Sequence, residues 1–182
     1  MSATATDTTY VEEISPGSGR RVAPRAHLRT TAPSLDLCGD WRFRLYPSAG
    51  EADAAASDPG FDDSGWDAID VPSHWVLRGD GRWGRPAYTN VKYPFPLDPP
   101  HVPDANPTGD HRRRFGLPPD WLAGGRVWLR FDGLESLGRV WLNGHEVGVV
   151  RGSRLRQELD VTDQVRAGEN VLVVRVHQWS GM

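Results

Sequence analysis

The stretch "RVWLRFDGLESLGRVWLNGHEVGVV", residues 126–150, decides the fold. Its first six residues alternate apolar side chains with arginine or tryptophan, which is the two-residue period of a strand buried on one face. Asn143-Gly144, flanked by further apolar residues, is the strongest short-range signal for a β-hairpin. The stretch therefore predicts one strand followed by a hairpin of two short strands.

The residues on either side continue the strand period. Two sets of apolar residues are predicted to face the core: Trp41, Phe43 and Leu45 from residues 40–47, and Leu172, Val174 and Val176 from residues 170–177. Residues 51–66 are expected to hold one short helical turn, and residues 67–75 an edge-like strand that ends at Pro72. Seven or eight short antiparallel strands, without a long amphipathic helix, predict an all-β fold, a β-sandwich.

The domain boundary is expected near residue 34. Residues 1–33 are rich in Ser, Thr, Pro and Gly and show no periodicity. They predict an extended tail that gains order only by docking on something else. The remaining residues, 34–182, are long enough for one domain with one hydrophobic core.

A long proline-rich segment interrupts the strands. Residues 84–109, "GRPAYTNVKYPFPLDPPHVPDANPTG", contain seven prolines. Proline donates no backbone hydrogen bond and restricts φ, so this segment is predicted to be a stiff arm rather than a strand or a flexible linker. Long loops of this kind are often functional, although a packing loop or a domain linker is the plainer interpretation.

Composition excludes several classes of protein. The net charge of −3 does not favour nucleic-acid binding, and the basic run "HRRRF" at residues 111–115 is predicted to be a solvated edge or an inter-domain face. Cys38 is the only cysteine, and no Cys/His spacing resembles a zinc site. No signal peptide and no apolar run near 18 residues is present, so we expect a soluble cytoplasmic protein without membrane contact.

Catalytic motifs are not found. The "RGSRL" run at residues 151–155 lacks the second glycine and the following helix of a nucleophile elbow, and no phosphate-binding glycine motif follows a strand. The six histidines are dispersed and are interpreted as surface or packing residues. The carboxylates Glu51, Asp53, Asp62 and Asp63 lie in polar loops, where we expect ordinary pKa values and no acid or base role.

Eight tryptophans are an unusually high count, and aromatic faces stack on sugar rings. Four of them fall beside strand patterns or turn boundaries and are predicted to pack internally: Trp41, Trp66, Trp121 and Trp141. Trp75, Trp83 and Trp179 lie at loop edges, which makes them the better candidates for contact with a ligand.

Five blocks in order carry a family resemblance: "SLDLCGDWRFRL", "FDDSGWDAIDVPSHW", "AYTNVKYPFPLDPPHVPDANPTG", "RVWLRFDGLESLGRVWLNGHEVGVVRGSRLRQELDVT" and "AGENVLVVRVHQWS". Over residues 25–181 the chain closely resembles the N-terminal sugar-binding domain of bacterial β-galactosidases of glycoside hydrolase family 2. The hairpin and the "GEN" turn are shared across that family, whereas "YTNVKYPF" and "GSRL" indicate its galactosidase branch.

The resemblance implies a jelly-roll β-sandwich of the galactose-binding-domain-like type, whose proline-rich arm reaches into the active site of a separate barrel. It implies that Asn90 hydrogen-bonds substrate hydroxyls, for which an uncharged amide that both donates and accepts is well suited. Val91 is expected to contribute more weakly through its backbone. An asparagine that caps its own turn remains the alternative for Asn90.

The resemblance also implies that this chain is an amino-terminal fragment that lacks the last strands of its sandwich. The two catalytic glutamates and the ligands for magnesium and sodium would lie outside it, so no catalytic residue, metal ligand or cofactor is expected in this chain, and the chain alone is expected to be inactive. Its expected partners are a galactoside and the rest of a homotetrameric enzyme. A free-standing carbohydrate-binding module and a complementing subunit of a split enzyme are the alternatives.

Overall fold

The computed structural model describes residues 7–24 and 31–181 of the chain. Within these residues, nine strands and five short 3-10 helices are present, and the fold is all-β, as predicted. The strands are β1 (Gly17–Gly19), β2 (Gly39–Tyr46), β3 (Asp67–Val71), β4 (Thr108–Leu117), β5 (Trp128–Phe131), β6 (Leu137–Leu142), β7 (His145–Arg151), β8 (Gln157–Asp160) and β9 (Gly168–His177). The 3-10 helices are η1 (Thr9–Val11), η2 (Ala54–Ser57), η3 (Trp75–Leu77), η4 (Gly79–Gly81) and η5 (Pro119–Gly124).

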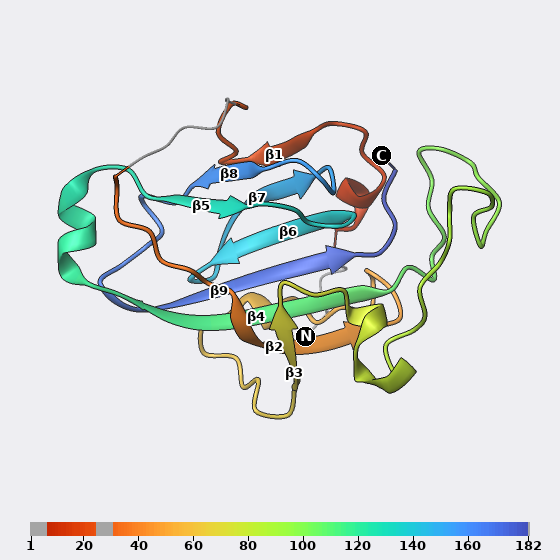
Figure 1. Cartoon of the computed structure of the whole chain (residues 1–182), viewed down its shortest axis with the longest axis horizontal. Coiled ribbons are helices and arrows are strands. Elements are labelled where there is room, and N and C mark those ends of the chain that lie inside the picture. The colour runs from red at the N-terminus through yellow and green to blue at the C-terminus, as the bar shows by residue number, and fades with distance from the viewer. Residues whose placement is uncertain (1–6, 25–30, 182) are drawn as a thin grey trace.

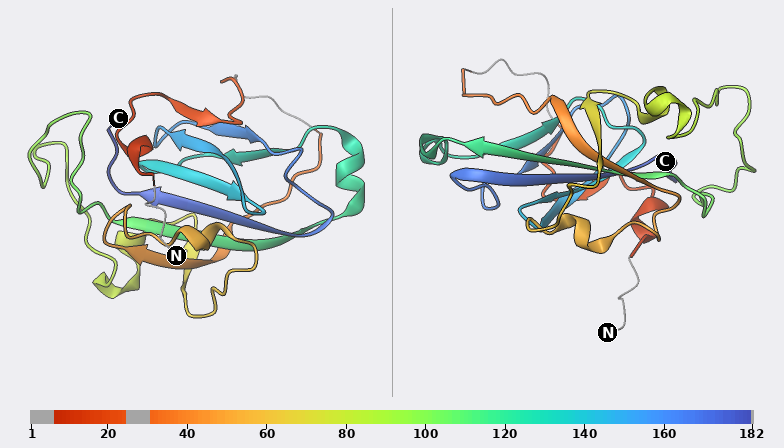
Figure 2. Two further views of the ribbon diagram at one scale, coloured as in Figure 1. Left: turned by 180° about the vertical axis from the view of Figure 1, so that it is seen from behind. Right: turned by 90° about the horizontal axis from the view of Figure 1, so that it is seen from below.

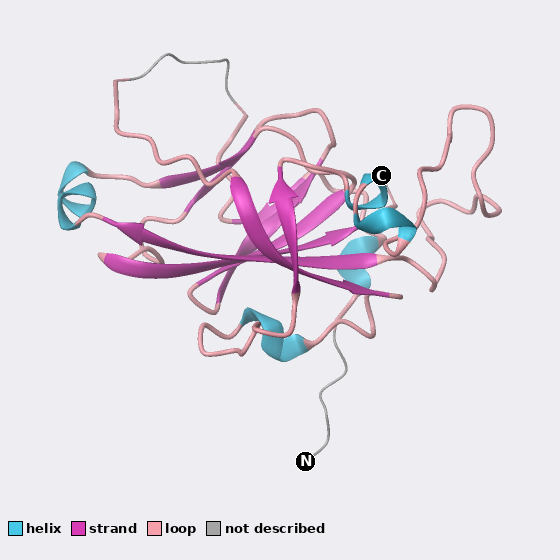
Figure 3. Cartoon of the chain, turned by 60° about the horizontal axis from the view of Figure 1, so that its bottom comes forward, coloured by secondary structure: helices cyan, strands magenta, loops and turns pink. Residues whose placement is uncertain are grey.

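Seven of these strands form one antiparallel sheet in the order β1-β7-β6-β9-β4-β2-β3, and β5 and β8 form a second sheet (Figure 1). The long strands β4 and β9 pair over ten residues in the middle of the larger sheet. The short helices lie around the strands rather than between them (Figure 3). β3 lies at the sheet's edge, and η2 is the predicted helical turn, so both predictions are confirmed.

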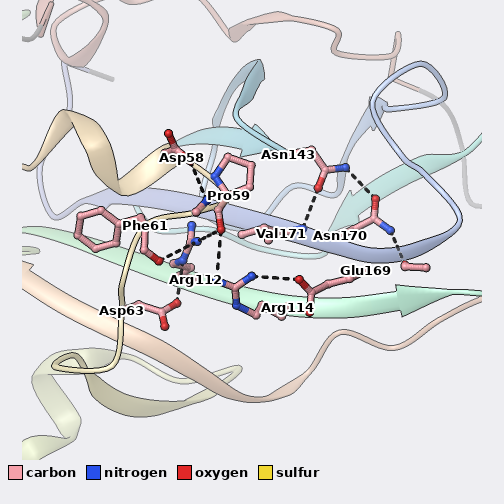
Figure 4. A network of polar contacts seen from close by, with 12 residues as sticks. Asp58, Pro59, Phe61, Asp63, Arg112, Arg114, Asn143, Glu169, Asn170 and Val171 are labelled. Carbon is pink, nitrogen blue, oxygen red and sulfur yellow. Dashed lines mark hydrogen bonds and ion pairs between the residues drawn. The ribbon is translucent and has the colours of Figure 1, made fainter.

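The hairpin is formed by β6 and β7 around Asn143-Gly144. Both turn residues have positive φ, 53° and 83°, which is the requirement of a tight two-residue hairpin turn and the reason for this residue pair. The Asn143 side chain also holds the neighbouring strand, because its Oδ1 accepts from Val171 N and its Nδ2 donates to Asn170 Oδ1 (Figure 4). The hairpin prediction is confirmed.

The main core lies between the two sheets. Phe43 is fully buried there, beside Trp41 and Leu172, and β5 contributes Leu129 and Phe131 from the opposite side. The predicted inward faces of β2, β5 and β9 are therefore confirmed. The other face of β9 is buried as well, although its alternating sequence predicted only one inward face. β9 therefore separates the main core from a second layer of buried side chains.

That second layer contains charged and polar side chains beside apolar ones. Arg175 and His177 of β9 are buried there with Asp110 of β4. It is covered by the loop that contains η2 and by the N-terminal segment, as the Arg175–Asp53 and His177–Tyr10 contacts show.

The "HRRRF" prediction is wrong. β4 is an interior strand between β9 and β2, and Arg112 is only 1% exposed. Its guanidinium donates to Asp63 at 2.7 Å and to the carbonyls of Ala56 and Pro59 (Figure 4). The loop that contains η2 folds over this face of the sheet and replaces water with these acceptors, so Asp63 is an ion-pair partner rather than a solvated loop carboxylate.

The tail prediction also needs correction, because residues 7–24 dock on the chain's own sandwich. η1 buries Tyr10 against β9, where its hydroxyl lies 2.6 Å from His177 Nε2. β1 pairs with β7, and a Cβ at Gly19 would lie 2.4 Å from Gly148 Cα, so glycine permits this close approach. Residues 1–6 and 25–30 of the predicted tail lie outside the described residues.

A candidate carbohydrate-contacting arm

The arm, residues 84–109, leaves the sandwich beside a buried aromatic anchor. Trp83 directly precedes it and is buried against Phe43, with the ring centroids 4.7 Å apart. From there the chain runs out beyond the sheets and returns to the start of β4 (Figures 1 and 2). Trp83 therefore fixes the point from which the arm departs.

The returning end of the arm is tied to the C-terminal segment. Asn106 Nδ2 donates to the Trp179 carbonyl and Asn106 Oδ1 accepts from Trp179 N, both at 2.9 Å. Gln178 N donates to the Pro107 carbonyl in the same region. Three hydrogen bonds across two segments hold this end in one position.

Two contacts stiffen the arm between its ends. Phe95 packs edge-on against Trp179 with centroids 5.1 Å apart, and Tyr93 lies beside both rings. Glu12 of the N-terminal segment accepts from Val102 N and pairs with His101 at 3.0 Å. That side-chain hydrogen bond raises the pKa of His101 and lowers the pKa of Glu12.

Asn90 lies in an exposed turn at residues 89–91, between Trp83 and the packed rings of Tyr93 and Phe95. Its Nδ2 donates to the Tyr88 hydroxyl at 2.8 Å. Val91 is 83% exposed and Tyr88 77% exposed. The turn thus presents an amide, a phenol and an apolar side chain to the outside, on a segment held at both ends. Among the described hydrogen bonds the Asn90 side chain binds a phenol rather than its own turn backbone.

The tryptophan predictions are confirmed only for the packing set. Trp41 and Trp66 are buried, and Trp121 and Trp141 are half-buried. The interpretation of Trp75 and Trp83 as ligand contacts is wrong, since they are 4% and 7% exposed. Trp75 begins η3 and Trp83 follows η4, and both rings pack on Phe43 of β2, which a strand-and-loop pattern does not reveal. Trp179 is half-buried and packs on the arm.

The remaining candidates form no second site. Asp53 caps η2, and Ser64 hydrogen bonds lower the pKa of Asp62. Ser153 precedes the strand β8 rather than a helix. Within residues 7–24 and 31–181 no group of three or more His, Cys, Asp or Glu side chains could hold a metal ion. No helix in the described part of the chain has the length and apolarity needed to cross a membrane.

Known proteins share this chain's sequence over most of its length. It is 56% identical over 185 residues to a β-galactosidase of Arthrobacter sp. (strain B7), covering 94% of this chain and 18% of that protein. It is 41% identical over 160 residues to a β-galactosidase of Vibrio cholerae, covering 88% of this chain and 15% of that protein. The chain thus spans less than a fifth of the length of these curated relatives.

Solved structures share its fold. A Bifidobacterium dentium β-glucuronidase complexed with coumarin-3-O-glucuronide matches with a TM-score of 0.60 and 26% identity, over 81% of this chain and 21% of that one. A Bacteroides uniformis β-glucuronidase matches with a TM-score of 0.56 and 27% identity, over 79% and 14%. The family model described as "Glycosyl hydrolases family 2, sugar binding domain" matches residues 34–182. The chain therefore belongs to glycosyl hydrolase family 2, and residues 34–182 are its sugar-binding domain.

Proposed function

We propose that this chain is the amino-terminal part of a β-galactosidase that hydrolyses terminal β-D-galactosides such as lactose with retention of configuration. In this proposal the chain supplies substrate contact and assembly, and the catalytic glutamates lie elsewhere in the complete enzyme. The observation that carries the proposal is the arm. It is held at both ends by the sandwich, yet it presents Asn90 and Val91 away from it. Stiffness of this kind lowers the entropy lost when a side chain is held against a substrate.

Exposed apolar side chains on the arm are consistent with contact between the arm and a neighbouring domain of the complete enzyme. Four of the exposed large apolar side chains lie on the arm, namely Tyr88, Val91, Tyr93 and Leu97. A neighbouring domain that covers them would remove their apolar surface from water. The names of the relatives, all β-galactosidases, support a galactoside as the substrate.

The finer expectations rest on the family resemblance alone. They are the jelly-roll topology, a homotetramer, and magnesium and sodium in the complete enzyme. A cytoplasmic location is a separate proposal, which comes from the sequence pattern and not from the resemblance. Among the described residues no group of three or more His, Cys, Asp or Glu side chains could hold a metal ion, and no ligand in this chain is assigned to either metal. A free-standing carbohydrate-binding module is less well supported, because Trp75 and Trp83 are buried and cannot form an exposed stacking platform.

The isolated 182-residue chain is expected to show no turnover of a nitrophenyl β-galactoside, because a retaining glycosidase requires two carboxylates about 5 to 5.5 Å apart on opposite sides of the scissile bond. Release of nitrophenol by the purified chain is the measurement. A parallel purification from the same galactosidase-free host, without the gene, is the control. Turnover above that control would contradict the proposed division of roles.

Replacing Asn90 tests the arm in the complete enzyme. Asn90→Ala is expected to lower kcat/KM for galactosides about three- to tenfold, the effect of losing one hydrogen bond to an uncharged group of about 0.5 to 1.5 kcal/mol. For a substrate analogue that lacks the hydroxyl bound by Asn90, the same substitution should lower kcat/KM much less. The melting temperature of the 182-residue chain should stay unchanged, because Asn90 is exposed.

Tyr88→Phe is the matched control, since it removes the hydroxyl that Asn90 binds but leaves the amide. Two results would show that Asn90 acts through its turn rather than on the substrate. One is a loss of kcat/KM in Tyr88→Phe equal to that in Asn90→Ala. The other is an equal loss in Asn90→Ala for the galactoside and for the analogue without the hydroxyl.

A further inference from the structure

The N-terminal segment holds a carboxylate in a fixed place beside the arm. Arg151 of β7, which is buried, donates to the carbonyls of Tyr10 and Ser15, and the Tyr10 hydroxyl meets His177 of β9. Glu12 lies between Tyr10 and Ser15 in the sequence, so its backbone is fixed to the larger sheet on both sides. Its side chain is therefore a firm point against which another segment can be held.

Both oxygens of the Glu12 carboxylate contact the arm. Oε1 accepts from Val102 N at 3.2 Å, and Oε2 lies 3.0 Å from His101 Nδ1. The Val102 side chain also packs on the buried cluster that contains Tyr10 and Val11. The arm is thus joined to the N-terminal segment by polar and apolar contacts, although 90 residues separate Glu12 from Val102.

The C-terminal segment meets the arm at the same place. η1, the arm and the C-terminal end all lie on one side of the sandwich (Figures 1 and 2). Gly181 N donates to the Val11 carbonyl at 3.0 Å. A Cβ on Gly181 would lie 2.6 Å from the carbonyl oxygens of both Glu12 and Pro100, so a larger residue would not permit this close approach. The three segments therefore form one junction.

A short path leads from this junction to the turn that carries Asn90. His101 N donates to the Asp98 carbonyl at 2.8 Å, which closes a tight turn beside the junction. Three residues before Asp98, Phe95 packs on Trp179 of the C-terminal segment. Four prolines between residues 93 and 101 restrict the backbone along this path. A displacement at the junction therefore moves the turn at residues 89–91.

We propose that Glu12 is a positioning residue for the proposed galactosidase reaction, because it holds the arm at the junction and thereby keeps Asn90 in one orientation toward the substrate. An amide that is already held in place loses less entropy on binding than an amide on a mobile loop. Glu12 acts only through the arm and does not touch the substrate. The inference rests on the proposed function, because positioning has an effect on catalysis only if the arm contacts a galactoside.

Hydrogen exchange of single amides in the 182-residue chain tests the contact. Glu12→Ala should speed exchange of the Val102 amide about tenfold or more at pH 6, the effect of losing a hydrogen bond to a charged group. The Gln178 amide, which donates to the Pro107 carbonyl, should exchange as in the parent chain. Asp104→Ala removes an exposed carboxylate of the arm and is the matched control, which should leave both amides unchanged. Unchanged exchange at Val102, or faster exchange at both amides, would overturn the proposal.

Kinetics of the complete enzyme test the consequence. Glu12→Ala should lower kcat/KM for a galactoside about two- to fivefold, less than Asn90→Ala, because a displaced amide still meets the substrate part of the time. In the Asn90→Ala background the same change should have little further effect, since both variants act on one contact. Additive losses would show that Glu12 acts elsewhere. No loss in the parent background would show that the arm is positioned without Glu12.

Glu12→Gln is the conservative variant. Its Oε1 can accept from Val102 N, and its Nε2 can donate to Nδ1 of a neutral His101. The charges that raise the pKa of His101 are Glu12, which acts most strongly, and Asp98. Without the Glu12 carboxylate, His101 is neutral at pH 8. Glu12→Gln should therefore retain at pH 8 most of the kcat/KM that Glu12→Ala loses, and equal losses in the two variants would contradict the proposed geometry.

The outcomes separate this inference from the proposed function. A complete enzyme that hydrolyses galactosides, together with unchanged Val102 exchange in Glu12→Ala, defeats the inference alone. Faster Val102 exchange, together with a complete enzyme inactive on galactosides, defeats the proposed function and leaves the contact between Glu12 and the arm in place.

Discussion

Acidification from about pH 6.5 to pH 4 is expected to unfold the chain progressively, because two histidines resist protonation: His177, which is buried, and His111, which is half-buried with its Nδ1 covered. Burial lowers the pKa of His111 to about 4 and the pKa of His177 to about 3. In the unfolded chain both titrate near the ordinary value of about 6.5. Between these values the unfolded state binds more protons than the native state, so stability is complete above about pH 6.5 and is lost as the pH falls.

The surroundings of His177 explain why it stays neutral. Thr108 Oγ1 donates to the Asn106 carbonyl, so it accepts from His177 Nδ1, and His177 Nε2 then accepts from the Tyr10 hydroxyl. A second ring proton on Nε2 would require the Tyr10 hydroxyl to turn its own proton away from His177 and accept instead. After burial, the nearby guanidinium groups of Arg175 and Arg139 disfavour the imidazolium further.

Each histidine contributes about 1.4 kcal/mol per pH unit inside its window, so the two together lower the free energy of unfolding by several kcal/mol near pH 4. Urea unfolding at pH 7, 6 and 5 is the measurement. His177→Gln, which keeps one donor and one acceptor, should roughly halve the pH slope. The exposed His145→Gln is the control and should leave the slope unchanged. A wild-type slope in His177→Gln, or ring NMR shifts of a charged His177 at pH 5, would contradict this account.

Arg175→Met is expected to destabilise the chain by about 3 to 5 kcal/mol, since it leaves a buried carboxylate without its partner. Arg175 donates to both oxygens of Asp110, at 2.7 and 2.8 Å, and also to the Asp53 carbonyl. Asp110 is completely buried. Asp53 leads into η2, so this one guanidinium joins β9, β4 and the loop that covers the sheet.

Urea unfolding of Arg175→Met, with Arg114→Met as the matched control, is the measurement. Arg114 of β4 pairs with Glu169 of β9 at 3.1 Å, across the same two strands, but both side chains are exposed, and such pairs contribute about 0 to 1 kcal/mol. Adding Asp110→Asn to Arg175→Met should recover part of the loss, because it removes the buried charge. Equal losses in the two arginine variants, or no recovery in the double variant, would show that the Asp110–Arg175 pair does not act as a buried ion pair.

Predictions that depend on residues close together in the sequence were correct, whereas predictions that depend on contacts between distant segments were not. The hairpin at Asn143-Gly144 and the inward faces of β2, β5 and β9 depend on neighbouring residues and on a strand period, so they could be predicted. The arm was identified from its prolines, because proline excludes a strand wherever the chain lies in space. The role of Asn90 came from the family resemblance and stays a prediction.

The wrong predictions share a different cause. A run of arginines is normally solvated, yet Arg112 is buried because a loop more than 40 residues earlier in the chain places Asp63 and two carbonyls around it. Trp75 and Trp83 were placed on the surface because loops are usually exposed, but their turns fold back over β2. The tail was expected to need another partner, and residues 7–24 dock on β7 and β9 instead.

The sequence by itself therefore determined the all-β class, the strand faces, the hairpin turn and the proline-rich arm, because backbone geometry and side-chain period act between residues close in the chain. Only the tertiary structure decided which polar residues are buried and which tryptophans are covered. Those outcomes depend on which distant segment arrives to exclude water. The burial of Asp110 with Arg175, 65 residues apart, is one such outcome, since neither residue's neighbours in sequence specify the other.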